Sequence, residues 1–184
     1  MSTFAALRRR PARMIAIGVG LALVAFVAVL ATRTTEPGTV ASSPLVGRAA
    51  PAISGVNVVT GQHVSLAGER GHYVVVAFFA SWCAPCAAET PQLVAFLFSE
   101  RAIHASVLGV IYYDSVSNAV NFLHSYGARW PVVADGSGAI AAEFGVDDPP
   151  EAFVVAPSGR IVAWITGGVT QTRLLQIVSR EGTE

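Results

Sequence analysis

Residues 73–89 read YVVVAFFASWCAPCAAE, and this stretch decides the fold. Its first part, Tyr73–Ala80, is a continuous apolar run, which is typical of a central β-strand buried on both faces. A helix is predicted from about Ala84 to Arg101, with Pro85 in its first turn, where the missing N–H breaks no hydrogen bond. The stretch therefore predicts a buried strand that turns into a helix within Trp82–Cys86.

Strands and helices alternate along the rest of the chain, which predicts an α/β sheet with helices on both faces. The predicted strands are a hairpin of Ala52–Val58 and His63–Leu66, then Ser106–Tyr113, Pro131–Ala134, Ala152–Ala156 and Arg160–Ile165. The predicted helices are Val116–Tyr126, Ser137–Phe144 and Thr170–Arg180.

The chain has two cysteines, Cys83 and Cys86, and Ala84 and Pro85 fill the two positions between them. A thiol at a helix N-terminus lies near unpaired backbone N–H groups and the positive end of the helix dipole, which favour the thiolate. The thiolate is the form that attacks a disulfide. We therefore expect Cys83 to be the nucleophile and Cys86, one turn along the helix, to resolve the mixed disulfide, so that the pair is a redox-active disulfide.

Other uses of the pair fit the sequence less well. A zinc site needs further ligands, and the four histidines show no metal-ligand spacing, so neither a metal nor another cofactor is expected. A purely structural disulfide that closes so short a loop removes little chain entropy. Peroxidase chemistry calls for a threonine or serine three residues before the attacking cysteine and a proline further upstream, where this chain has Ala80 and Val76.

The N-terminal part of the chain predicts a membrane anchor. Four arginines within residues 1–13 precede Met14–Ala31, which has 18 residues and no charge. As a helix this run spans about 27 Å, enough for the hydrocarbon core of a bilayer. Arg33 is alone on the other flank, so the positive-inside rule predicts a single-pass inner-membrane protein with residues 1–13 in the cytoplasm. A cleaved signal peptide ending at Ala31 is the alternative.

The remaining domain is then outside the cytoplasm. Residues 32–44 are rich in Thr, Ser, Pro and Gly and are predicted to be a flexible linker, and residues 45–184 form the working domain. The whole chain has 12 basic and 12 acidic residues, a balance that excludes a basic nucleic-acid-binding protein.

Three stretches resemble the thioredoxin superfamily, and in particular the membrane-tethered thiol:disulfide interchange proteins of the DsbE/CcmG and ResA/TlpA type. They are Val75–Glu89 with the cysteine pair, Gly109–Asp114 (GVIYYD) and Phe144–Phe153 (FGVDDPPEAF). The resemblance implies a thioredoxin-like fold, which is a central mixed β-sheet flanked by helices. It also implies an N-terminal β-hairpin and a central insertion that contains Val116–Tyr126.

The resemblance also assigns residues to substrate binding. Pro150 falls on the cis-proline of the family, which lies against the cysteines and presents backbone to a substrate. Pro149 departs from the family, which usually has a small apolar residue there, and its ring removes an N–H that would pair with a bound peptide. Glu151 either orients substrate, tunes Cys83 or is a solvated loop acid. Trp82 either covers the thiol pair or only packs.

Glu89 matches a glutamate at the same spacing in the ResA and CcmG groups. It follows Cys86 by three residues, hence lies on the same helix face, where a carboxylate raises the pKa of the thiol or shuttles its proton. The alternative is a first-turn glutamate stabilised by the helix dipole. The buried aspartate of thioredoxin corresponds to Ala77 here, which favours Glu89 as the proton carrier.

The resemblance implies a thiol-disulfide oxidoreductase that reduces the haem-binding Cys-x-x-Cys-His disulfide of apocytochrome c or of other exported thiol proteins. A membrane electron donor of the DsbD/CcdA type would regenerate it. Two alternatives stay open, an oxidase that introduces disulfides into exported proteins and a non-catalytic binding module of a membrane assembly. The direction depends on a reduction potential that the sequence does not give.

Overall fold

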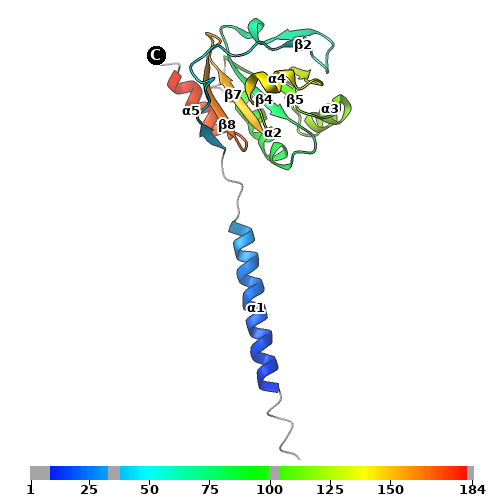
Figure 1. Ribbon diagram of the computed structural model, residues 1–184, viewed down its shortest axis with the longest axis vertical. Helices are drawn as coiled ribbons and strands as arrows, with labels where there is room; N and C mark the ends of the chain where they lie inside the picture. The colour runs from blue at the N-terminus through cyan, green and yellow to red at the C-terminus, as the bar shows by residue number, and fades with distance from the viewer. Residues whose placement is uncertain (1–8, 33–37, 100–103, 182–184) are drawn as a thin grey trace, which may run out of the picture. The chain divides into compact units, whose positions relative to one another are not determined.

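The computed structural model describes residues 9–32, 38–99 and 104–181, in two compact units (Figure 1). The first unit, Met1–Glu36, contains the helix α1 (Arg9–Thr32). The second unit, Pro37–Glu184, contains every strand and every other helix of the described residues.

The helix α1 includes the whole run that was predicted to be an anchor, and its large apolar side chains between Met14 and Val27 are exposed. Within the part of the chain that the structure describes, no helix combines the length and the apolar character that crossing a membrane requires. The membrane span of residues 14–31 therefore stays a prediction. Residues 1–8 of the predicted basic segment, and Arg33, lie outside the described residues.

The second unit is built on a six-stranded mixed sheet of order β1-β8-β7-β4-β5-β6 (Figure 1). At its centre β4 pairs in parallel with β5 and antiparallel with β7, and every residue of β4 is buried. The predicted central strand and mixed sheet are thus confirmed. The strands are β1 (Thr39–Ala41), β4 (Tyr73–Phe79), β5 (Ala105–Ile111), β6 (Val132–Ala134), β7 (Glu151–Val155) and β8 (Ile161–Thr166).

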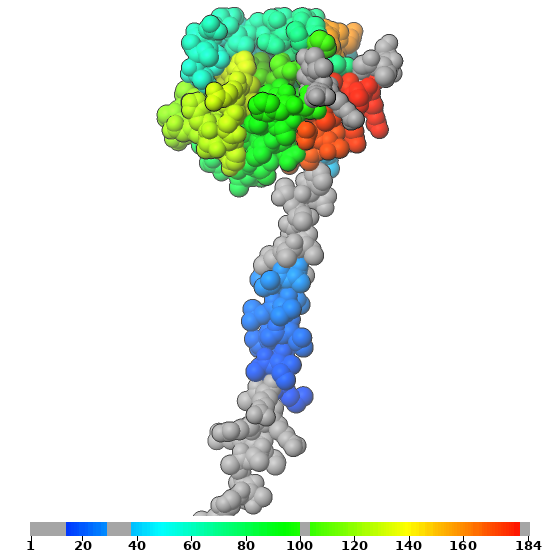
Figure 2. Space-filling model, turned by 180° about the vertical axis from the view of Figure 1, so that it is seen from behind, coloured from blue at the N-terminus to red at the C-terminus, as the bar shows by residue number. Residues whose placement is uncertain are grey.

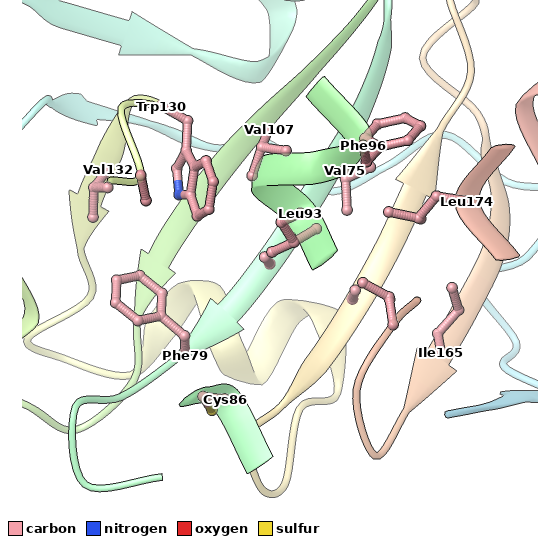
Figure 3. Close-up of a cluster of buried hydrophobic side chains, with 14 of the residues drawn as sticks. Val75, Phe79, Cys86, Leu93, Phe96, Val107, Trp130, Val132, Ile165 and Leu174 are labelled. Carbon is pink, nitrogen blue, oxygen red and sulfur yellow. The ribbon is translucent and has the colours of Figure 1, made fainter. Parts of the chain in front are cut away.

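Helices cover both faces of the sheet, as predicted. On one face pack α2 (Ala84–Leu97), α3 (Val116–Ser125) and α5 (Gln171–Glu181), and Figure 2 shows α2 between the other two. Leu93, Phe96 and Leu174 from these helices meet Val75 and Val107 of the sheet in the cluster of Figure 3. The other face is covered by the 3₁₀ helix η1 (Leu66–Glu69) and α4 (Ala139–Phe144).

The N-terminal hairpin of the domain is also confirmed, with β2 (Ser54–Val56) antiparallel to β3 (His63–Ser65). The helix α2 ends at Leu97 with Phe98 as its C-cap, so it is shorter than predicted. Residues 100 and 101 of the predicted helix lie outside the described residues.

The domain begins earlier in the chain than predicted. Thr39–Ala41, inside the predicted flexible linker 32–44, is the edge strand β1 and pairs antiparallel with β8, with Val40 opposite Ile165. The sheet of the domain therefore includes Thr39–Ala41, which precede the predicted start at Leu45. Three residues carry too little alternation to be recognised alone, and their partner lies more than a hundred residues away.

Gly109 of β5 leaves room for neighbouring side chains in the core. A Cβ there would lie 3.1 Å from Phe79 Cε1, 3.2 Å from Trp130 Nε1 and 3.2 Å from Val132 Cγ2. We predict that Gly109→Ala lowers the free energy of unfolding by about 1–3 kcal/mol, because overpacking shifts these side chains. Urea unfolding of the oxidised chain measures it.

The matched control is Gly136→Ala, since a Cβ at Gly136 meets no atom within 4 Å. Its unfolding free energy is expected to stay within about 0.5 kcal/mol of the wild type. Equal stability of the two variants would contradict the tight packing at Gly109.

Candidate active site

The two cysteines lie where β4 gives way to α2. Cys83 and Cys86 form a disulfide with their Cα atoms 5.2 Å apart. Cys83 is the N-cap of α2, and its Sγ accepts a hydrogen bond of 3.1 Å from the backbone N–H of Cys86. In the reduced protein this N–H and the helix dipole stabilise a thiolate at Cys83. Cys83 is 4% exposed and Cys86 1%, so Cys83 is the sulfur nearer to solvent.

The predicted proline loop lies against Cys83. The peptide bond between Pro149 and Pro150 is cis, and the carbonyl oxygen of Pro149 lies 3.4 Å from Cys83 Sγ. Pro149 has no N–H, so at this residue the backbone offers a bound chain only a carbonyl acceptor. The carbonyl of Pro150 accepts a hydrogen bond from Gly167 N–H at 3.1 Å, which ties the loop to the segment after β8.

Glu151 is buried rather than solvated, so the solvated-acid interpretation is wrong. Its Oε2 accepts a hydrogen bond of 2.6 Å from Trp164 Nε1, and its Oε1 accepts one of 3.1 Å from Asp147 N–H. The first contact anchors Glu151 to β8, and the second fixes the chain directly before the cis-proline. The geometry makes Glu151 a residue that positions residues 147–150.

Glu89 is buried in the first half of α2, only 5% exposed. Burial raises the pKa of its carboxyl from 4.5 to about 8, against the lowering effect of a hydrogen bond from the Val169 backbone. A dipole-stabilised surface carboxylate does not fit this environment, because the neutral form dominates at pH 7. A neutral carboxyl beside the cysteine pair is a proton donor.

Glu89 and Cys86 line the same small cavity, of about 10 Å³. Its other walls come from the strand β4, the helices α2 and α3 and the connection before β6, namely Ala77, Phe79, Thr90, Leu93, Leu123 and Trp130. Ala77, at the position of the thioredoxin aspartate, adds no polar group. Glu89 is therefore the carboxyl of this cavity.

Trp82 lies immediately before the disulfide and is 55% exposed. Its Nε1 donates a hydrogen bond of 3.2 Å to the carbonyl oxygen of Tyr113. Tyr113 is also exposed and has a φ of 41°, which is unusual for a residue with a side chain. Two aromatic side chains thus face solvent beside the cysteines.

Asp114 connects these two loops. Its carboxylate accepts hydrogen bonds of 2.7 Å from the backbone N–H groups of Ser81 and Ser115. Burial raises the pKa of Asp114, but the hydrogen bonds from Ser81, Ser115 and Asn118 outweigh burial and lower the pKa overall. The ionised side chain therefore holds the loop that carries Trp82.

The structure thus brings Glu89, Pro149 and Pro150 close to the disulfide between Cys83 and Cys86. Sequence reasoning missed four residues that support them, Tyr113, Trp130, Gly168 and Val169. Gly167 and Gly168 both have positive φ, and two adjacent glycines after a strand are the signal that would have indicated this turn. Trp130 carries no such signal, because only tertiary packing brings it to the cavity.

Within residues 9–32, 38–99 and 104–181, no three His, Cys, Asp or Glu side chains lie close enough together to hold a metal ion.

Comparison with known proteins agrees with this geometry. The chain is 27% identical over 114 residues to thiol-disulfide oxidoreductase ResA of Bacillus subtilis, covering 62% of this chain and 64% of ResA. It is 36% identical over 124 residues to a thiol:disulfide interchange protein DsbE homolog of Paracoccus denitrificans, covering 65% of each protein. The matches thus span somewhat less than two thirds of these relatives.

Solved structures match the second unit. The thioredoxin domain of a thiol-disulfide oxidoreductase from Bacteroides vulgatus superposes with a TM-score of 0.66 at 25% identity, over 76% of this chain and 99% of that domain. A thioredoxin-family thiol:disulfide interchange protein from Chlorobium tepidum gives 0.64 at 28% identity, over 76% and 98%. Residues 46–164 match the AhpC/TSA family. With this family match over residues 46–164 and its thioredoxin-like fold, the chain belongs to the AhpC/TSA family.

Proposed function

We propose that this chain is an extracytoplasmic thiol-disulfide oxidoreductase that reduces the disulfide of the haem-binding Cys-x-x-Cys-His segment in apocytochrome c. One observation carries the proposal, the disulfide between Cys83 and Cys86 at the start of α2, with Pro149 O 3.4 Å from Cys83 Sγ. The names of the relatives support the activity, since ResA and the DsbE homolog are called a thiol-disulfide oxidoreductase and a thiol:disulfide interchange protein.

The chemistry follows from the two sulfur positions. In the reduced enzyme the Cys83 thiolate attacks one sulfur of the substrate disulfide and releases the other as a thiolate. Cys86 then attacks the Cys83 sulfur, releases the reduced substrate and closes the enzyme disulfide. Two electrons pass to the substrate, and a membrane dithiol donor of the DsbD/CcdA type restores the enzyme.

The surroundings of Cys83 favour a polypeptide substrate over a small molecule. The exposed Trp82 and Tyr113 offer apolar contact area beside the sulfur. The cis-proline loop offers the Pro149 carbonyl as an acceptor for a substrate N–H. Ala80, fully buried three residues before Cys83, supplies no hydroxyl for peroxide chemistry.

We place the domain outside the cytoplasm, with residues 14–31 in the inner membrane and residues 1–13 on the cytoplasmic side. The arginines that precede the uncharged run support this orientation. A disulfide between Cys83 and Cys86 suits an oxidising compartment, where it persists until a dedicated donor reduces it.

Capture of the substrate tests the proposal directly. In a Cys86→Ser variant the mixed disulfide at Cys83 has no resolving thiol, so we predict that it accumulates on substrate proteins in intact cells. Non-reducing gels and mass spectrometry identify what is bound. The control is the double variant Cys83→Ser, Cys86→Ser, which is expected to capture nothing.

The captured proteins decide between substrates. Exported proteins that contain Cys-x-x-Cys-His are the expected result. Exported proteins without that segment would refute the cytochrome assignment, and captured proteins that are all cytoplasmic would refute the location.

The direction of electron flow has its own measurement. We predict that the full chain, equilibrated with dithiothreitol or glutathione buffers, has a reduction potential nearer to about −270 mV, as in thioredoxin, than to about −120 mV, as in DsbA. It is then expected to reduce insulin. A reduction potential near about −120 mV would indicate an oxidase. If the chain exchanged no disulfide at all, it would be a non-catalytic binding module.

Glu89 predicts how stability depends on pH. Its folded pKa of about 8 exceeds the ordinary glutamate value of 4.5, so the folded state binds the proton more tightly than the unfolded state. The stability that Glu89 contributes is fully present below pH 4.5 and is lost as the pH rises from 4.5 to about 8. The loss is about 1.4 kcal/mol for each unit of difference between the two pKa values.

We therefore predict that Glu89→Gln flattens the pH profile of the oxidised chain between pH 5 and 9, and that this variant exceeds the wild type in stability at the alkaline end. Urea unfolding across this range measures both. Glu143→Gln, on the exposed side of α4, is the matched control and is expected to keep the wild-type profile. A Glu89→Gln profile as steep as the wild type would show that another group carries the dependence.

A further inference from the structure

The cavity behind the disulfide is large enough for a single water molecule. It measures about 10 Å³, and Glu89, Trp130 and Cys86 line it. A space of about this size holds one water when polar groups are there to bind it. Thr90, which also lines it, donates its hydroxyl to the Cys86 carbonyl at 2.8 Å, so its donor is already used.

Two polar atoms of the cavity residues are unpaired. Glu89 Oε1 and Trp130 Nε1 are buried, and within the described part of the chain neither has a hydrogen-bond partner. Their residues are 5% and 6% exposed, so bulk solvent does not satisfy them. An unsatisfied buried polar group costs about 1–3 kcal/mol. The indole N–H is a donor, and the neutral carboxyl of Glu89 has a proton to donate, so one water molecule that accepts from both satisfies them.

The indole of Trp130 is held in this place by its neighbours. Figure 3 shows Trp130, Phe79 and Leu93 around one part of the core, with Cys86 at its edge. A Cβ on Gly109 would lie 3.2 Å from Trp130 Nε1, so the ring packs directly on the strand backbone. Close packing on this side keeps the N–H inside the protein.

We propose that this cavity binds one water molecule, which accepts hydrogen bonds from Trp130 Nε1–H and from the protonated carboxyl of Glu89 and contacts Cys86 Sγ. Trp130 is then a positioning residue for proton transfer between Cys86 and Glu89. This inference rests on the proposed oxidoreductase function and adds the route of the proton to it.

The proton moves in opposite directions in the two halves of the cycle. When the donor thiolate bonds to Cys83 and the enzyme disulfide breaks, Cys86 leaves as a thiolate and takes a proton through the water from neutral Glu89. When the Cys86 thiol later attacks the Cys83 sulfur of the mixed disulfide, its proton returns through the water to the Glu89 carboxylate. The substrate thiolate takes its own proton from solvent, so atoms and charges balance.

Nuclear magnetic resonance of the oxidised full chain with ¹⁵N-labelled tryptophan tests the water directly. We expect the Trp130 indole signal, assigned by its loss in Trp130→Phe, to show a cross-peak to a long-lived water. We also expect it to shift with pH as Glu89 titrates, and to lose that shift in Glu89→Gln. The Trp82 indole, bound to the Tyr113 carbonyl, is the internal reference.

Two results of this experiment would overturn the proposal. The absence of a water cross-peak at the Trp130 indole would remove the bridging molecule. A Trp130 signal that stays constant through the titration of Glu89 would remove the connection between the two side chains. Neither result bears on whether the cysteine pair exchanges disulfides.

Kinetics with Ellman's reagent tests the function of the water. The reduced chain releases a first thionitrobenzoate when Cys83 attacks, and a second when Cys86 resolves the mixed disulfide. We expect Trp130→Phe to slow the second phase about tenfold at pH 7 and to change its pH profile, with the first phase within about twofold of the wild type. An aromatic ring is kept and the N–H donor is lost, together with part of the ring volume.

Leu174→Met is the packing control, because Leu174 lies in the same core cluster but is not among the residues that line the cavity. It is expected to keep both phases and the pH profile. Equal slowing of both phases in Trp130→Phe, or an unchanged second phase, would show that Trp130 only packs. A wild-type chain without any second phase would refute the proposed function itself.

Discussion

The hydrogen bond from Cys86 N–H to Cys83 Sγ is the contact on which the rest of this structure depends. It makes Cys83, the proposed nucleophile, the N-cap of α2, so the same interaction fixes the helix and this sulfur. The strand β4 ends at Phe79 with every residue buried, so it is a rigid base for this turn. A thiolate at Cys83 therefore stabilises the helix that in turn stabilises the thiolate.

The sequence predicted the parts of the fold that are encoded locally. The apolar run of β4, the hairpin of β2 and β3 and the cysteine pair at a helix start each depend on neighbouring residues, and each is present. The edge strand β1 depends on β8 far along the chain, and three residues of Thr, Val and Ala do not reveal that partner. The predicted linker 32–44 thus contained part of the sheet.

In the candidate site, too, the features encoded by neighbouring residues were predictable and those that depend on distant residues were not. The spacing of Cys86 and Glu89 on one helix was readable, but the burial of Glu89 was not, because Trp130 and Val169 come from distant connections. Glu151 is a similar case. Its position after the prolines was recognised through a family resemblance, whereas its bond to Trp164 follows only from the pairing of β7 with β8.

The placement of the acid on α2 rather than on β4 has a physical consequence. With Ala77 on the strand, the cavity beside Cys86 keeps space that a strand carboxylate would fill, and the acid enters from the helix that also carries the sulfur. Because Glu89 and Cys86 share one helix, a single element fixes their separation. Trp130 lines the same cavity and supplies a hydrogen-bond donor to it. The high pKa of Glu89 thus follows from its burial in a closed, preformed site, where a neutral carboxyl lies close to the disulfide.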